Sequence, residues 1–338
     1  MANDANKLRS SLHNLGFGDS AIEAAWPGWW TDDAVSSPSA NAELRFSLAR
    51  KLGLDPRSLT EDGEPRFVWR EAKFKRLTGE TDFEKSALAS FGASLARALT
   101  GASEARESIE GYSAASLRGL LLMRQPFVRL VDLLGLCWAI GIPVIHLRIF
   151  PLSAKKMCAM AVRAENRHAI LLGKDANYPA PIAYYLAHEI GHIALGHLKG
   201  ALAVVDLQDP LEEETRVDDE ERAADRFALE LLTGTPEPIV TTETKRFTAE
   251  QLAQNLLATA SSLNVEPGTL ALCYGHSTND WAKAQAAMKY IYTDPHPVWL
   301  EVNQVAQREI DWAKISDDFG LFVRAVMGAI RNDDRRAR

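Results

Sequence analysis

The segment His188–His192 has the sequence His-Glu-Ile-Gly-His, which places two imidazoles and a carboxylate within one short stretch. Residues four apart lie on the same face of an α-helix, so His188 and His192 can offer ring nitrogens to a single metal ion. Glu189 is turned by about 100° from the first histidine, where its carboxylate can reach a water on that ion without displacing it. The pattern therefore predicts a metal centre in which Glu189 activates a water.

The residues around this motif favour a buried helix over 184–199. Apolar side chains surround the motif and leave one polar stripe, and they are Leu186, Ile190, Ile193 and Leu195. Gly196 provides a C-terminal stop. The alternative interpretation is an amphipathic helix that carries two structural histidines.

A catalytic zinc site needs a third protein ligand and one open position for water. His197 is nearby in the sequence, but on an ideal helix it lies about 180° from His188 and about 140° from His192. We therefore exclude His197 from the predicted ligands. The metzincin spacing would need Gly and His at positions occupied by Leu195 and Leu198, so that pattern is absent as well.

A second predicted helix, over 220–232, supplies the missing group. Glu221 and Asp225 are four residues apart on one face of this helix. We predict that Glu221 is the third metal ligand and that Asp225 accepts the second ring N–H of His188. Glu220 is the rival for the ligand position. An exposed acidic helix start, favoured by the helix dipole, is the structural alternative.

The two motifs together resemble a known family. His-Glu-Ile-Gly-His, followed about thirty residues later by Glu-x-x-Ala-Asp-x-Phe-Ala-x-x-Leu-Leu, is similar to the ImmA/IrrE metallopeptidases, a gluzincin-like group. The resemblance covers 128–232. It implies a zinc endopeptidase that cuts a phage-repressor-like (Xre) transcriptional regulator, often encoded nearby, and so relieves repression in a stress, mobile-element or defence response.

The resemblance also implies a role for each matching residue. His188, His192 and Glu221 would bind Zn2+, Glu189 would be the general base, and Asp225 would be the supporting carboxylate. One departure is the connection over 201–219, which is longer and more acidic than in many members of the family. It could be a lid, an autoinhibitory segment or a disordered one.

Strand patterns precede the motif helix. Residues 142–150 are β-branched and alternating, and 157–163 can pair with 167–173 as a hairpin. We predict a mostly α, α+β fold in which a small antiparallel or mixed sheet lies beside the helix of a zincin-like peptidase. The segment 167–173 is our candidate for the edge strand that an extended substrate would join. His146 and His168 lie on these strands and are not assigned to the metal.

The expected organisation has three parts. A helical N-terminal region covers 1–110, the zincin-like peptidase domain covers 111–240, and a helical C-terminal region with a substrate-recognising or regulatory role covers 241–338. In the last part, Tyr274 and His276 could stabilise an oxyanion, although a structural role is the alternative.

The N-terminal region also contains a weak DNA-binding pattern. Residues 41–59 resemble part of an Xre-like helix-turn-helix, and 41–77 contains nine basic against six acidic residues. DNA contact is one interpretation, and a solvated helix is the other. A DNA-binding regulator or a toxin–antitoxin component, with the peptidase domain as sensor or scaffold, is therefore the alternative function.

Composition restricts the remaining choices. The formal net charge of −7 argues against attraction of nucleic acid to the whole surface. Three cysteines without CxxC spacing indicate no disulfide framework and no cysteine metal site. We find neither a signal-peptide pattern nor an apolar run that could span a bilayer, so we expect a cytoplasmic protein without membrane contact. The oligomeric state stays open.

Overall fold

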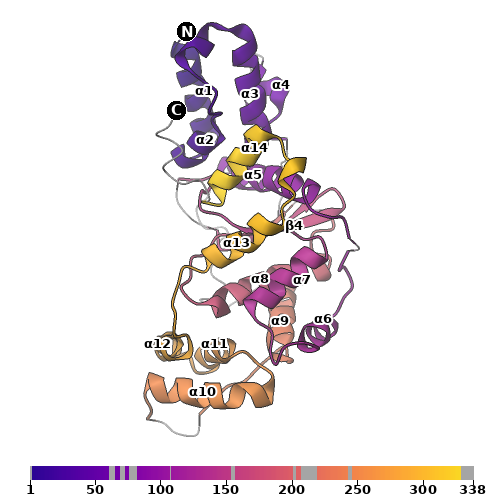
Figure 1. Cartoon of the computed structure of the whole chain (residues 1–338), viewed down its shortest axis with the longest axis vertical. Coiled ribbons are helices and arrows are strands. Elements are labelled where there is room, and N and C mark those ends of the chain that lie inside the picture. The colour runs from indigo at the N-terminus through magenta and orange to yellow at the C-terminus, as the bar shows by residue number, and fades with distance from the viewer. Residues whose placement is uncertain are drawn as a thin grey trace.

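The protein, seen here in a computed structural model, has a mostly helical α+β fold with a mixed sheet near the middle of an elongated molecule (Figure 1). The structure describes residues 2–60, 65–68, 73–75, 82–106, 108–153, 157–200, 203–206, 219–242 and 246–328. Within these ranges, none of the helices combines the length and the apolar character that crossing a membrane requires. The predicted fold class is confirmed.

The sheet of the described residues has five strands in the order β1-β5-β3-β4-β2. These strands are β1 (Lys73–Lys75), β2 (Val144–His146), β3 (Ala159–Ala164), β4 (Arg167–Leu172) and β5 (Ala203–Asp206). Strand β3 is antiparallel to both β4 and β5, whereas β1 is parallel to β5 and β2 is parallel to β4. The predicted hairpin is confirmed, because Ala164 pairs with Arg167 across a tight turn.

Two predictions about the sheet need correction. The segment 167–173 is not an edge strand, because β4 lies between β3 and β2. The connection 201–219 also contains a strand that we did not predict. This strand is β5, which pairs with β1 on one side and with β3 on the other. The residues 207–218 of this connection lie outside the described part of the chain.

The helices form three groups along the molecule (Figure 1). The N-terminal end contains α1 (Ala2–Asn14), α2 (Asp19–Ala25), α3 (Pro38–Leu52), α4 (Pro56–Thr60) and α5 (Asp82–Gly101), with α14 (Asp317–Val326) and the 3-10 turns η1 (Asp32–Ser36) and η2 (Trp312–Lys314). The middle contains α6 (Ala114–Leu122), α7 (Leu130–Ala139), α8 (Pro179–Ala194), α9 (Asp219–Thr233) and α13 (Trp299–Glu309). The far end contains α10 (Ala249–Leu263), α11 (Pro267–Thr278) and α12 (Trp281–Ile291).

The sheet is buried on both faces, and the alternation of side chains along β3 shows how. Met160 and Val162 belong to the core that contains α5 and the N-terminal helices. Ala159 and Ala161 point the other way, into the core that contains α8 and α9. Helix α8 packs on β3 and β4. The sheet thus provides a rigid support for the helix that carries the motif.

The C-terminal range 241–338 is distributed over the whole molecule. Helices α10–α12 form a separate core, whereas α14 packs on α2 and α3. The buried Lys51 in α3 donates hydrogen bonds to Asp318 of α14, at 2.7 Å, and to the carbonyl of Ala25. Burial lowers the pKa of Lys51.

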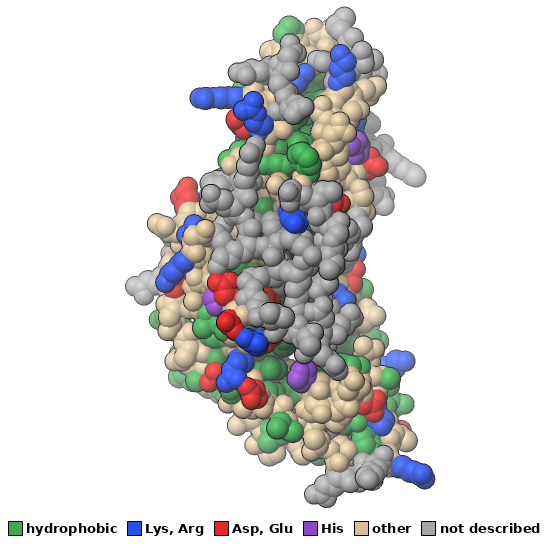
Figure 2. All heavy atoms as spheres, turned by 180° about the vertical axis from the view of Figure 1, so that it is seen from behind, with side chains coloured by type: hydrophobic (Ala, Val, Ile, Leu, Met, Phe, Trp, Pro, Cys, Tyr) green, Lys and Arg blue, Asp and Glu red, His purple; other side chains and the backbone are tan. Residues whose placement is uncertain are grey.

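These contacts bear on the predicted DNA contact through 41–77. Lys51 is one of the nine basic residues of that segment, yet its ammonium group lies inside the protein. The helix after the turn at Gly53 is α4, which has five residues. On the face shown in Figure 2, the coloured basic and acidic side chains of the described residues are interspersed. The helix-turn-helix resemblance stays a prediction.

Candidate metal centre

Helix α8 begins at a proline and is largely buried. Tyr178 is the N-cap residue and Pro179 occupies the first turn, where the missing N–H of proline has no cost. Every residue from 182 to 194 is buried. The motif histidines therefore lie in the interior, where solvent does not compete for their ring nitrogens.

Helix α9 packs closely against α8 because residue 191 is a glycine. A Cβ atom at Gly191 would lie 3.2 Å from the Ala224 carbonyl oxygen and 3.2 Å from the Phe227 Cβ. The apolar face of α9 joins the core beneath α8. This close contact brings the first turn of α9, which contains Glu221, next to the motif.

Three ligand-type side chains converge between the two helices. The Nε2 atoms of His188 and His192 are 2.9 Å apart. Glu221 Oε2 lies 3.4 Å from His188 Nε2, and Glu221 Oε1 lies 3.3 Å from His192 Nε2. All three side chains are at least 97% buried. In the described part of the chain, these residues form the group of His, Cys, Asp and Glu side chains that could hold a metal ion.

The spacing of these atoms fits a zinc ion. Ligands at about 2.0–2.2 Å in tetrahedral arrangement are roughly 3.3 Å from one another. The observed separations of 2.9, 3.3 and 3.4 Å lie close to this value. A buried carboxylate facing two imidazole nitrogens is also costly unless a cation or protons compensate it. Of the two carboxylates considered, Glu221 and not Glu220 belongs to the converging group.

A carboxylate and a phenol lie behind His188. Its Nδ1 atom is 3.0 Å from Asp225 Oδ1, as predicted, and the Tyr184 hydroxyl donates a hydrogen bond of 2.7 Å to the same oxygen. Nothing in the motif pointed to Tyr184, although it lies four residues before His188 and so shares its helix face. Tyr184 thus helps to hold the Asp225 oxygen that faces His188.

A third histidine lies behind His192. The His197 Nδ1 atom is 2.8 Å from His192 Nδ1. Helical angles excluded His197 as a metal ligand, and the structure places it beside the ring nitrogen that points away from the converging group. His197 therefore contacts the Nδ1 atom of His192, just as Asp225 contacts the Nδ1 atom of His188.

The end of α8 explains this position. The Gly196 N–H donates to the Ile193 carbonyl and the His197 N–H donates to the His192 carbonyl, with Gly196 in the left-handed region at φ 73°. This is a Schellman motif, in which the residue after the glycine folds back over the last turn. Angles of an ideal helix do not apply beyond that stop, so the sequence could not place His197.

The other predicted groups lie as follows. Glu189 is buried on α8, next to the first histidine. Tyr274 donates a hydrogen bond to Asp280 at the start of α12, which is a structural contact. His276 lines a cavity between α8, α11 and α12.

The comparison with known families addresses this same region. The family model described as peptidase U49 matches residues 165–263. The matched range contains β4, α8, β5, α9 and α10, and thus every residue of the converging group. The match supports a peptidase, as the sequence predicted, and does not extend to the helix-turn-helix resemblance at 41–59. No curated protein matches the chain.

Proposed function

We propose that this protein is a zinc-dependent endopeptidase. The observation that carries the proposal is that His188, His192 and Glu221 are buried and converge on one point. Glu189 lies on α8 next to His188. The three converging residues would hold the ion, and three protein ligands leave a fourth position for water. The match to a peptidase family supports the same reaction class.

In the proposed reaction, the ion and the protein side chains have different roles. A zinc ion held here supplies Lewis acidity and a bound water with a pKa of about 7. Glu189 takes the proton from the attacking water and delivers it to the leaving amine. Asp225 accepts the His188 Nδ1–H and leaves the Nε2 lone pair for the ion. His197 accepts the corresponding proton of His192.

The substrate that we propose is a protein, and specifically a phage-repressor-like regulator encoded nearby. The support is the resemblance of 128–232 to the ImmA/IrrE peptidases, whose members cut such regulators. Cleavage would relieve repression in a stress, mobile-element or defence response. The reaction would take place in the cytoplasm.

A single substitution tests the mechanism. We expect Glu189→Gln to retain about one zinc per chain, because the ligands are unchanged, and to lower cleavage by at least about 10²-fold because no base remains. Zinc is measured by elemental mass spectrometry, and cleavage is measured on the product of the adjacent gene during co-expression. A Glu189→Gln variant that cuts as fast as the wild type would exclude this mechanism.

A further inference from the structure

A cavity of about 1450 Å³ lies between the first half of α8, the segment 174–178 before it, and helices α11 and α12. Sites for small molecules usually measure about 300–1,000 Å³, so this space suits a larger occupant. Its walls combine aromatic rings with aliphatic side chains, namely Tyr178, Tyr185, Trp281, Leu272 and Met288. Such walls favour large apolar side chains of a polypeptide.

Two residues of α8 that line the cavity precede Glu189 on the same helix. They are Pro181 and Tyr185, which precede Glu189 by eight and four residues. Residues four apart on a helix differ by about 40° in direction and about 6 Å along the axis. Tyr185 and Glu189 therefore belong to one stripe of α8. The part of the lining at Tyr185 is thus about one helical turn from Glu189 along α8.

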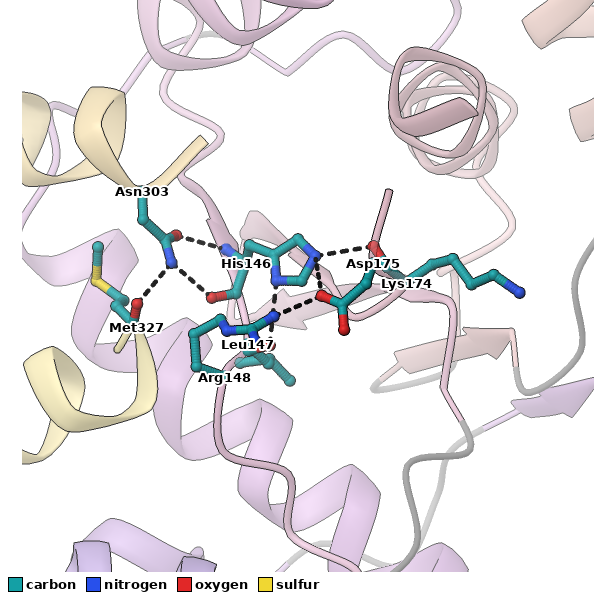
Figure 3. Close-up of polar contacts among 7 residues, drawn as sticks. All are labelled: His146, Leu147, Arg148, Lys174, Asp175, Asn303 and Met327. Carbon is teal, nitrogen blue, oxygen red and sulfur yellow. Dashed lines mark hydrogen bonds and ion pairs between the residues drawn. The ribbon is translucent and has the colours of Figure 1, made fainter. Parts of the chain in front are cut away.

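One rim of the cavity is anchored from behind. The ring of His146, on β2, lies with Nε2 at 2.9 Å from the Lys174 carbonyl oxygen, and Arg148 pairs with Asp175 (Figure 3). Both Lys174 and Asp175 line the cavity. In Figure 3 the Lys174 side chain extends away from His146. The Lys174 backbone and the Asp175 side chain thus connect this rim to the sheet, while the Lys174 side chain points away from it.

The opposite wall is also preformed. A Cβ atom at Gly275 would lie 2.8 Å from the ring of Trp281, so α11 and α12 pack closely at this point. Tyr178 stacks on Tyr292 with ring centroids 5.4 Å apart, which holds the start of α8 against the end of α12. A preformed site binds with less loss of conformational entropy.

The charged side chains that line the cavity favour an occupant of one charge. The described lining contains two lysines, Lys174 and Lys289, and one carboxylate, Asp175. The described lining is therefore positive, in a chain whose formal net charge is −7. This local sign favours a segment that carries carboxylates.

We propose that this cavity is a docking pocket for an acidic segment of the protein substrate that carries an aromatic or large aliphatic residue. The proposal rests on the proposed peptidase function, whose substrate it describes. The apolar side chain enters between Tyr178, Tyr185 and Trp281. The carboxylates face Lys289 at the opening, and the chain continues along α8 toward Glu189.

The test blocks the pocket chemically in the full chain. The three native cysteines are buried, and burial raises the pKa of the Cys273 thiol to about 12, so an added surface cysteine is the reactive one. Gln285→Cys on the exposed pocket wall and Ser261→Cys on the exposed face of α10 are each made in the zinc-loaded Glu189→Gln protein. Both are labelled with pyrene maleimide, and Ser261→Cys is the matched control.

The probe is a phage library of random dodecapeptides, selected on the unlabelled Gln285→Cys protein. We expect enrichment of peptides with an aromatic or large aliphatic residue beside acidic ones. Calorimetry with a synthetic enriched peptide should show at least about tenfold weaker binding after labelling at Gln285→Cys, and unchanged binding after labelling at Ser261→Cys. Lys289→Gln should weaken the same peptide by about three- to tenfold.

Three results would overturn the proposal: no enrichment of acidic apolar peptides, equal affinity with and without the label at position 285, or a labelled protein that dissociates from dimer to monomer in sedimentation. The last would assign the cavity to a second copy of the chain. Binding is measured without cleavage, so the two proposals can fail separately. Peptides that dock but are never cut by the wild type would count against the peptidase function alone.

Discussion

The molecule contains two clusters built on buried histidines, and they differ in what the ring nitrogens face. In the converging group on α8, the Nε2 atoms of His188 and His192 point at each other and at the Glu221 carboxylate. On β2, His146 has Nδ1 at 3.1 Å from the Leu147 carbonyl oxygen, while its Nε2 faces another carbonyl (Figure 3). All three histidines are at least 99% buried.

The difference teaches that burial and residue type do not identify a metal ligand, whereas the hydrogen-bonding capacity of the neighbours does. A carbonyl oxygen only accepts, so whichever ring nitrogen of His146 carries the proton donates it to a carbonyl. In the described part of the chain, His146 is not in the group that could hold a metal ion. On α8 the outer nitrogens face Asp225 and His197, which can accept protons, and the inner nitrogens keep their lone pairs.

The largest expected effect comes from replacing one histidine of each cluster by alanine and comparing the zinc affinities. His192→Ala should lower zinc affinity by at least about 10³-fold, well beyond the effect of losing an outer partner. His146→Ala should leave zinc affinity unchanged and destabilise the fold by about 2–4 kcal/mol, because a buried ring and its contacts with the Leu147 and Lys174 carbonyls are lost. Zinc affinity is measured by chelator competition, and stability is measured by urea unfolding of the metal-free proteins.

Loss of zinc binding in the folded His146→Ala protein would break the distinction between the two clusters. His146→Gln provides a control for packing, because its amide can donate to one of the two carbonyls. It should recover part of the stability without any effect on zinc.

A smaller effect is expected at His197. His197→Leu removes the acceptor for His192 Nδ1–H, and we expect zinc affinity to fall by about 10–100-fold. His197→Gln retains an acceptor oxygen and should recover most of that loss. Chelator competition is the measurement, with urea unfolding of the metal-free chain as the control, since a purely structural role would change stability in both variants. Equal zinc affinities in all three proteins would show that His192 needs no partner.

The smallest effect concerns His168 on β4, a buried histidine outside both clusters. Burial lowers its pKa, and Arg163 adds to the shift. In the folded protein the His168 ring therefore binds a proton less readily than in the unfolded chain. The free energy of unfolding is consequently highest above the ordinary histidine pKa of about 6.5, and it falls as the pH drops below that value. Urea midpoints of metal-free protein at pH 8 and pH 5.5 should differ less in His168→Gln than in the wild type. An unchanged difference would exclude His168 as the cause.

Much of the site was predictable because its determinants are local. The four-residue spacing of His188 and His192, and of Glu221 and Asp225, fixes each pair on one helix face. The hairpin of β3 and β4 was predictable for a similar reason, since strand alternation and a tight turn are local features. Only the approach of α9 to α8 depends on tertiary packing, and Gly191 permits it.

The missing parts depend on non-local structure. Strand β5 is short and lies in an acidic segment, so its own pattern did not reveal the pairing with β1 and β3. The edge position was misassigned to 167–173 because strand order depends on which distant segments pair, and β2 covers β4 on that side. The contact of His197 with His192 could not be predicted for another reason, since helical geometry ends at Gly196.

The helix stop at Gly196 also offers a way to search other sequences. A glycine four residues after the second motif histidine sets the backbone turn, and the next residue is then returned over that histidine. His-Glu-x-x-His-x-x-x-Gly-His is therefore a ten-letter signature with a geometric reason for each defined position. Chains that carry it should support the second motif histidine from the turn that ends the same helix, with no help from a distant segment, and a one-residue insertion before the glycine should remove that support.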